Sequence, residues 1–269
     1  MNPTISQIRI YPVKSLDPVS LTEAEVGFHC LKHDREFAML ADDGRFVNGK
    51  RTGQVNLLKA AYDLEGQIIR LSHRDGTAIG EFHLLRQSKE LEKTLGDFFG
   101  YRVHLLHRTK GELMDIPDVS SVTILGEGSL QSLHQSFPHL DFENLRLRFR
   151  ATIEISGVPA YWEENLFGQP GTGIQFQAGE VTMIGISPRA RCNVPPRDPM
   201  TGEPDKTFIK TMMKSRSATL PTDSLLPVYG SLYQLSVNVY LPESEQGKFL
   251  RKGDEIRITG PVALEESEA

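Results

Sequence analysis

A short segment in the last third of the chain has the composition of a reactive loop. Residues 188–202 read PRARCNVPPRDPMTG and follow an alternating, strand-like run, so their four prolines predict a stiff loop. Cys192 lies in this segment close to three arginines, Arg189, Arg191 and Arg197. Nearby guanidinium charge favours the thiolate, which is the form of cysteine that attacks electrophiles and binds metals. We therefore expect Cys192 to be chemically active.

Two roles are open for Cys192 at this point. As a nucleophile it would need a base and an orienting group, which a linear sequence does not place in space. As a metal ligand it could not hold an ion alone, so an organic chelator would have to supply further sulfur ligands. Such a cofactor would be anionic and would require cationic and hydroxyl groups around it. The second cysteine, Cys30, lies in the apolar context VGFHCL and is predicted to be a structural core residue.

A phosphate-loop pattern elsewhere in the chain is a coincidence of spacing. Residues 44–50 satisfy G-x-x-x-x-G-K, but Arg51 replaces the Ser or Thr that would hold magnesium. Asp43-Gly44 lies between two apolar pairs, which predicts a hairpin turn, and residues 52–54 do not resemble the start of a helix. The G-x-G-x-x-G, H-E-x-x-H and G-x-S-x-G motifs are absent, so nucleotide-binding, zinc-protease and serine-hydrolase functions lack their usual sequence support.

The overall composition excludes several classes of protein. The chain has 269 residues, and its 30 Lys and Arg against 35 Asp and Glu make it too acidic for a general nucleic-acid binder. The N-terminus lacks the basic and apolar run of a signal peptide, and no stretch of about 18 apolar residues could span a bilayer. Two cysteines cannot form a disulfide framework or bind an iron–sulfur cluster. We expect a cytoplasmic protein that binds neither nucleic acid nor membrane.

The periodicity of the sequence predicts a mainly β fold with a few short helices. Apolar and polar residues alternate in four short runs, at residues 8–10, 153–155, 235–239 and 256–258. This pattern is typical of strands in barrels or sandwiches. Helices are expected at residues 88–99, at residues 127–137 and in a segment that follows Asp205 as its N-cap. A boundary near residues 117–121 would divide the chain into two β-rich halves.

Several motifs, taken in their order along the chain, resemble a known family. They are Ile10-Tyr-Pro-Val-Lys14-Ser15, Asp34-Arg35 followed by Phe37, Phe149-Arg150 before a strand, Pro188-x-x-Arg191-Cys192 followed by Asp198-Pro-x-Thr-Gly202, and Gly253-Asp254 near the end. This set resembles the MOSC (molybdenum cofactor sulfurase C-terminal) proteins in which a β-barrel domain precedes the MOSC domain, and it is similar to the amidoxime-reducing components.

The resemblance implies an α+β, mainly β fold with two domains. An N-terminal β-barrel-like domain of residues 1–118 would pack on a C-terminal MOSC-type β-barrel of residues 119–264, and the cofactor would lie in the cleft between them. Residues 265–269 would form an acidic tail.

The resemblance also implies a molybdenum–molybdopterin cofactor and the residues that bind it. Cys192 would be the protein thiolate on molybdenum, and Arg189 or Arg191 would orient the substrate or the cofactor during catalysis. The pterin and its phosphate would contact Lys14, Ser15, Arg35, Arg150 and Thr152, with Ser120 or Ser121 at the mouth. The chain departs from the family pattern at Ala190, where relatives carry Ser, and at Ala151-Thr152, where they carry Pro-Asn.

Two functions fit these residues. The first is a molybdenum-dependent oxidoreductase that reduces small N-hydroxylated compounds. Its electrons would come from a separate flavin, haem or iron–sulfur protein, because the chain has no signature for such a group. The alternative is a molybdenum cofactor carrier or a sulfur-transfer protein, in which Cys192 would hold the cofactor or carry a persulfide. A cysteine hydrolase has less support, since no local His or Asn arrangement accompanies Cys192.

Overall fold

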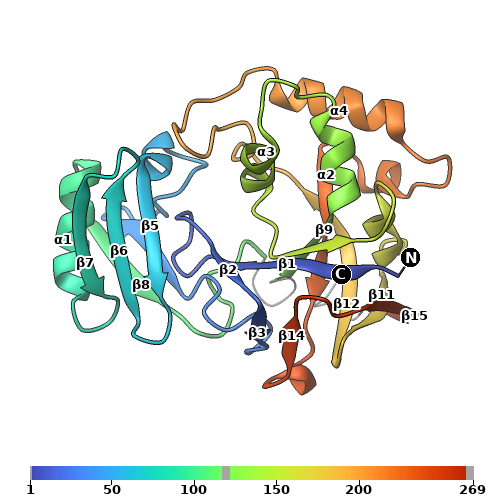
Figure 1. The fold of residues 1–269 in the computed structure, drawn as a ribbon, viewed down its shortest axis with the longest axis horizontal. Helices are drawn as coiled ribbons and strands as arrows, with labels where there is room; N and C mark the ends of the chain where they lie inside the picture. Colours follow the sequence, from blue (N-terminus) through green and yellow to red (C-terminus); the bar gives the residue numbers. More distant parts are fainter. Residues whose placement is uncertain (1, 117–121, 265–269) are drawn as a thin grey trace.

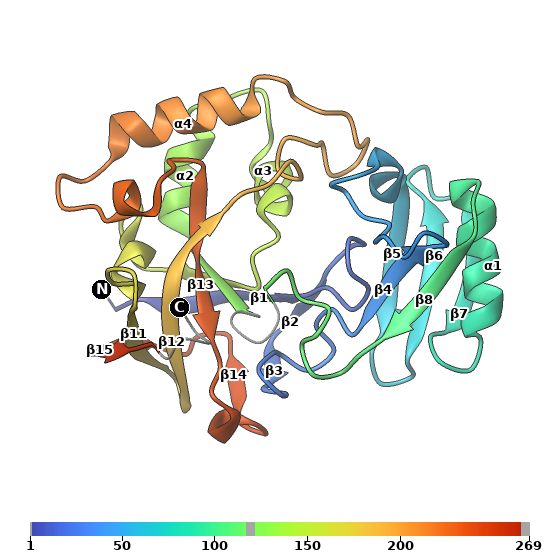
Figure 2. The same cartoon turned by 180° about the vertical axis from the view of Figure 1, so that it is seen from behind.

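The computed structural model describes residues 2–116 and 122–264, and most of its regular structure is β-strand (Figure 1). Fifteen strands and four α-helices lie in this part of the chain. They form two lobes that lie side by side in both ribbon views (Figure 1, Figure 2). The expected mainly β, α+β fold class is confirmed.

The larger lobe, called here the sheet lobe, contains an eight-stranded sheet. Its strands in spatial order are β15 (Ile256–Ala263), β11 (Thr172–Ala178), β12 (Val181–Ala190), β13 (Gln234–Tyr240), β9 (Val122–Gly126), β10 (Ile153–Ser156), β1 (Thr4–Ile10) and β2 (Val19–Leu21). Only β9 and β10 are parallel neighbours among these. The sheet curls so that Thr4 makes an isolated bridge to Glu255, beside β15, but no continuous ladder among the described residues closes it into a barrel. A short pair, β3 (Glu23–Glu25) with β14 (Phe249–Arg251), packs against the same core.

The smaller lobe, called here the N-terminal lobe, comprises residues 37–107. Its elements are β4 (Phe37–Ala41), β5 (Leu58–Asp63), β6 (Ile68–His73), β7 (Ala78–His83), α1 (Ser88–Phe99) and β8 (Val103–His107). Strands β5, β6 and β7 form an antiparallel meander, and β4 pairs with β8. Helix α1 has the predicted bounds: Leu91, Leu95 and Phe99 bury one face, and Gly100 ends the helix in the left-handed conformation.

Three of the predicted alternating strands are buried on both faces, and in β1 the polar residue Arg9 is buried between Ile8 and Ile10. In β13, Val237 and Val239 lie in the core of the sheet lobe, and the polar residues between them, Ser236 and Asn238, are buried as well. In β10 the same holds for Glu154. The alternation therefore predicts the strands correctly, but the polar side is covered by other protein groups and not by water.

Three helices belong to the sheet lobe. They are α2 (Glu127–His134), α3 (Phe142–Phe149) and α4 (Phe208–Thr219). Helix α2 ends three residues before the predicted end, and α3 was not predicted. The N-cap of α4 is Thr207, so the prediction of Asp205 is wrong; the Asp205 carboxylate instead accepts a hydrogen bond from the Thr207 backbone NH.

Two local predictions in the N-terminal lobe had opposite outcomes. The hairpin turn is confirmed by Gly44, at a φ of 74°, and by the bridge between Leu40 and Phe46. The prediction for residues 52–54 is wrong, because a short 3₁₀ helix spans Gly53–Leu57 and Thr52 caps it.

Strand β1, at the start of the chain, belongs to the same sheet as strands from the second half of the chain. Strand β1 pairs with β10, which lies more than 140 residues later, so residues 4–10 share a sheet with C-terminal strands. A domain division at residues 118 and 119 stays a prediction, and the expected boundary segment 117–121 and tail 265–269 lie outside the described residues. No helix in the described part of the chain is long and apolar enough to cross a membrane.

Candidate functional site

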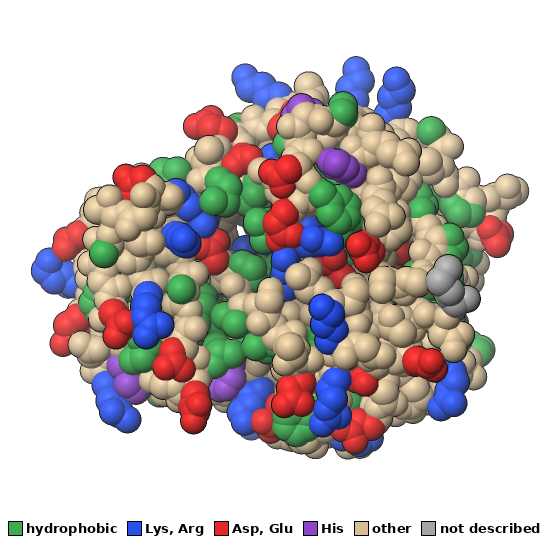
Figure 3. Space-filling model, in the orientation of Figure 1, with side chains coloured by type: hydrophobic (Ala, Val, Ile, Leu, Met, Phe, Trp, Pro, Cys, Tyr) green, Lys and Arg blue, Asp and Glu red, His purple; other side chains and the backbone are tan. Residues whose placement is uncertain are grey.

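The candidate site is a cleft between the two lobes with a cavity volume of about 310 Å³. This volume is within the range of small-molecule sites. The lining comes from the segments after β1 and β4, from α3 and its C-terminal end, and from the Cys192 segment after β12. In the space-filling view the molecule is hollowed between its halves, and Lys and Arg side chains lie at the hollow (Figure 3).

Positive charge is concentrated in this cleft although the whole chain carries a net charge of −5. Among the described residues, nine lining side chains are cations: Lys14, Arg35, Lys50, Arg74, Arg148, Arg150, Arg189, Arg191 and Arg197. Only Asp17 and Asp115 are acidic within the same described lining. Burial lowers the pKa of Lys14 and Arg150. Such a surplus of mostly half-buried cations makes the cleft a favourable place for an anion.

Cys192 lies on the cleft wall and is partly exposed. Its carbonyl oxygen accepts a hydrogen bond from the Tyr233 hydroxyl at 3.1 Å, which ties this segment to the chain just before β13. The first three residues of the predicted loop, Pro188 to Ala190, are instead the end of β12. The thiol therefore follows directly after a strand that is hydrogen-bonded into the sheet.

Cys30 has the opposite environment, as predicted. Its side chain is buried in the described structure, and burial raises the pKa of its thiol to about 12. A buried thiol with such a pKa is almost entirely protonated near neutral pH.

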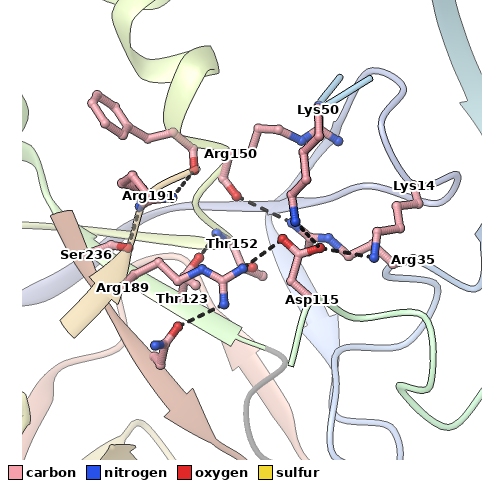
Figure 4. Close-up of polar contacts among 12 residues, drawn as sticks. Lys14, Arg35, Lys50, Asp115, Thr123, Arg150, Thr152, Arg189, Arg191 and Ser236 are labelled. Carbon is pink, nitrogen blue, oxygen red and sulfur yellow. Dashed lines mark hydrogen bonds and ion pairs between the residues drawn. The ribbon is translucent and has the colours of Figure 1, made fainter. Parts of the chain in front are cut away.

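Arg191 is held by the protein itself. Its guanidinium donates to the Leu235 carbonyl from Nε at 2.9 Å and from Nη2 at 2.5 Å, and to the Phe149 carbonyl from Nη1 at 2.9 Å. Nη2 also donates to the Ser236 hydroxyl at 2.6 Å (Figure 4). Burial lowers the pKa of Arg191. Arg191 thus links the Cys192 segment to β13 and to the end of α3.

Arg189 is directed into the cleft (Figure 4). Its Nη1 donates to Asn238 at 3.2 Å, and its Nη2 forms an ion pair of 2.9 Å with Asp115. Burial lowers the pKa of Arg189 as well. The two arginines that were predicted as alternative orienting residues therefore differ in their surroundings: Arg191 donates mainly to backbone carbonyls, whereas Arg189 faces an acid in the cavity.

The other cationic residues predicted for the site also line the cleft. Lys14 forms an ion pair of 3.1 Å with Asp115 and donates to a backbone carbonyl at 2.7 Å. The guanidinium groups of Arg35 and Arg150 lie 4.7 Å and 4.0 Å from the ring centre of Tyr11. Both arginines are therefore fixed by stacking on one aromatic ring.

Three of these positions have an unusual backbone. Ser15, Arg35 and Arg150 have φ angles of 78°, 54° and 50°, and they are among eight non-glycine residues with positive φ in the described chain. Ser15 lies in the lining beside Lys14. Non-glycine residues in this region cost conformational energy and cluster at functional sites.

Thr152 contributes a hydroxyl without a partner. Its side chain is 1% exposed, and its Oγ1 makes no hydrogen bond in the described structure, although the residue belongs to the cleft lining. A buried hydroxyl that remains unpaired is costly, so this atom is suited to a bound ligand. The two predicted mouth residues, Ser120 and Ser121, lie outside the described residues.

Six charged residues of the described lining were not predicted from the sequence as site residues: Lys50, Arg74, Arg148, Arg197, Asp17 and Asp115. Arg197 donates to the carbonyl of Gly49 at 2.8 Å, so the Cys192 segment contacts the N-terminal lobe. Lys50 is the lysine of the G-x-x-x-x-G-K pattern at residues 44–50. It lines the cleft although this segment is a hairpin turn and not a phosphate loop. The proline-rich loop gave a signal for Arg197, but no pattern distinguished Asp115 from other acids.

One protein family and two kinds of known protein are similar to this chain. Residues 2–96 match the model of the MOSC N-terminal beta barrel domain. The chain is 22% identical over 276 residues to the molybdenum cofactor sulfurase of Caenorhabditis briggsae, covering 95% of this chain and 36% of that protein. It is 24% identical over 274 residues to the mitochondrial amidoxime reducing component 2 of Bos taurus, covering 86% and 79%. The chain thus spans about a third of the length of the sulfurase and most of the amidoxime reducing component.

A solved structure, the YUAD protein from Bacillus subtilis, aligns over 98% of both chains with 13% identity and a TM-score of 0.37. The family match and the two relatives converge on one group of proteins. Residues 2–96 match the MOSC N-terminal beta barrel domain family, and the chain as a whole is similar to molybdenum cofactor sulfurases and to an amidoxime reducing component.

Proposed function

We propose that the chain binds a molybdopterin-type molybdenum cofactor in the cleft, with Cys192 as the protein ligand of the metal, and reduces small N-hydroxylated compounds. The observation that carries this proposal is the partly exposed Cys192 thiol on the wall of a cleft lined by nine described cations. Similarity to the bovine amidoxime reducing component supports the choice of reaction.

The donor groups of the cleft fit such a cofactor. A phosphate and anionic sulfur ligands would meet the surplus of cations, and Thr152 offers an unpaired buried hydroxyl. Cys192 offers a soft thiolate ligand, which suits a transition metal that already has sulfur ligands from a chelator. When bound, the cofactor would supply the two-electron redox chemistry.

The chain's own residues have separate tasks in this proposal. Arg35 and Arg150, fixed on Tyr11, would bind the phosphate end, because guanidinium groups match phosphate oxygens in pairs. Arg191 would keep Cys192 in position through its contacts to β13. Arg189 faces the cavity and would orient a substrate or the cofactor. Electrons would come from a separate donor protein of the flavin, haem or iron–sulfur class.

A carrier or sulfur-transfer function is the second candidate. The specific observation in its favour is the match to the sulfurase of Caenorhabditis briggsae, which covers 95% of this chain. Cys192 would then hold the cofactor for delivery or carry a persulfide. The same cleft serves this function, so the two candidates differ in what the protein does after binding.

Molybdenum content tests whether the chain binds the cofactor and whether Cys192 is the metal ligand. The wild type, Cys192→Ser and Cys30→Ser would be produced in a host that synthesises the cofactor, and metal would be measured by mass spectrometry. We expect close to one molybdenum per chain in the wild type and in Cys30→Ser, and a strong loss in Cys192→Ser, because only Cys192 lines the cleft. A folded wild type without molybdenum, beside a loaded control protein, would contradict cofactor binding.

Activity separates the two candidate functions. A reductase that has been chemically reduced is re-oxidised by an amidoxime and keeps its molybdenum. A carrier instead transfers cofactor to an apo-acceptor, and a sulfur-transfer protein shows a persulfide on Cys192 by mass spectrometry. Retained metal without re-oxidation by any N-hydroxylated compound would remove the reductase proposal.

A further inference from the structure

Asp115 is the acidic side chain on which three cations of the cleft converge (Figure 4). Its carboxylate lies 3.1 Å from Lys14 Nζ, 2.9 Å from Arg189 Nη2 and 3.9 Å from Lys50 Nζ. Lys50 belongs to the N-terminal lobe, Arg189 to β12 of the sheet lobe, and Lys14 to the segment after β1. One carboxylate thus occupies the point where cations from both lobes meet.

The other acid in the described lining has a different task. Asp17 pairs with Arg74 through both carboxylate oxygens, at 2.9 Å and 2.8 Å, and also accepts from the Ala60 backbone NH. It is therefore committed to fixing one arginine and one strand. Asp115 instead neutralises cations that point into the cavity.

Asp115 is placed so that it can withdraw. Its side chain is 38% exposed, and it lies in the irregular run of residues 108–116 that follows β8. Its partners are held more firmly: Arg189 is part of β12 and also donates to Asn238, and the Lys14 backbone NH donates to Phe37. If the carboxylate moved, Arg189 would keep its place, because β12 and Asn238 also hold it.

We propose that Asp115 is an internal stand-in for a bound anion: its carboxylate fills an oxyanion subsite formed by Lys14, Lys50 and Arg189, and a phosphate-class ligand displaces it. The proposal rests on the proposed function only in taking the ligand to be an oxyanion. Although burial alone would raise the pKa of Asp115, the cations around it hold that pKa well below the ordinary value, so the carboxylate is charged when a ligand arrives.

The size of the effect follows from the exposure of these ion pairs. Partly exposed pairs are each worth only a fraction of a kilocalorie to about 1 kcal/mol, because water screens them. A ligand that displaces Asp115 must break these pairs, and their summed contribution of about 1 kcal/mol is subtracted from its binding free energy. Removing the charge of Asp115 should therefore strengthen binding of an oxyanion about five-fold.

The test uses the cofactor-free full chain and pyrophosphate as the probe. Its affinity for the wild type, Asp115→Asn and Glu112→Gln is measured by titration calorimetry at low ionic strength. Glu112 is a matched control because it lies three residues before Asp115 and loses the same charge on substitution. Its carboxylate accepts a hydrogen bond from the Lys110 backbone NH and does not line the cleft. Circular dichroism and thermal unfolding confirm that each variant is folded, and Asp115→Ser is a second variant should Asp115→Asn fail to fold.

We expect about five-fold tighter pyrophosphate binding in Asp115→Asn and an unchanged affinity in Glu112→Gln. Weaker binding in Asp115→Asn would overturn the proposal, because Asp115 would then position the cations for the ligand and would not compete with it. Equal gains in both variants would overturn it too, since they would reflect net charge alone. Because the probe contains no molybdenum, the result stands whether or not the chain binds the proposed cofactor.

Discussion

Arg189 and Arg191 lie two positions apart and carry the same charge, but the structure gives them different tasks. Arg191 donates four hydrogen bonds to three protein oxygens, whereas Arg189 pairs with an acid that lines the cavity. We predict that Arg191→Met mainly lowers stability and that Arg189→Met mainly changes oxyanion binding. Each variant removes one cation from the same segment, so each is the control for the other.

The magnitude for Arg191→Met follows from its contacts. Hydrogen bonds to a charged group contribute about 1.5–3 kcal/mol each, and the substitution leaves the carbonyls of Leu235 and Phe149 without this donor. Burying the guanidinium charge costs free energy, as the lowered pKa of Arg191 indicates. Removing the charge recovers that cost and offsets part of the stability lost with the hydrogen bonds. A net loss of about 3 kcal/mol is expected, which corresponds to a fall in melting temperature of roughly 6–12 °C for a chain of this size.

The expected loss for Arg189→Met is about 1 kcal/mol or less, because its ion pair with Asp115 is partly exposed. Urea unfolding followed by circular dichroism measures both free energies of unfolding, and calorimetric titration with pyrophosphate measures binding. We expect Arg189→Met to bind pyrophosphate several-fold more weakly with near wild-type stability. The reasoning is refuted if Arg191→Met is as stable as the wild type but loses pyrophosphate binding, or if Arg189→Met is the less stable variant.

Three further predictions follow from the same structure. Iodoacetamide near neutral pH should modify Cys192 and spare Cys30, whose buried thiol has a pKa of about 12; equal labelling of both in the folded protein, read by mass spectrometry, would contradict this. Burial lowers the pKa of Lys14, so its charge is lost at lower pH than that of an exposed lysine. In a pH titration, pyrophosphate affinity should therefore fall before the ordinary lysine pKa of about 10.4 is reached, but should stay flat in Lys14→Arg. Gly202→Ala should lower the free energy of unfolding in urea by at least about 2 kcal/mol, because φ is 75° and a Cβ would lie 2.3 Å from the backbone oxygen of Gly53. Gly44→Ala is the control: its φ is 74° but the space around it is open, so it should lower that free energy by about 1 kcal/mol.

Local patterns were sufficient where neighbouring residues decide the structure. Helix α1 has the predicted bounds, because the spacing of its apolar residues and the terminal Gly100 act within one segment. Helix α3 escaped prediction, because charged residues interrupt its short apolar face. Arg148, one of them, is 4% exposed and donates to the carbonyls of Pro195 and Pro196, so a residue typical of the surface became internal through a distant loop.

The sequence by itself determined the mainly β class, the buried environment of Cys30 and a set of motifs whose order pointed to one family. Those properties depend on residue type, on period and on order along the chain. Only the tertiary structure decided that Lys14 and Arg189 both form ion pairs with Asp115, and that Arg191 donates its hydrogen bonds to backbone carbonyls. Lys14 and Asp115 are 101 positions apart, Asp115 and Arg189 are 74 apart, and Arg191 reaches a strand residue 44 positions away. They arise because β1 pairs with β10 and the two lobes close around one cleft, which no local pattern encodes.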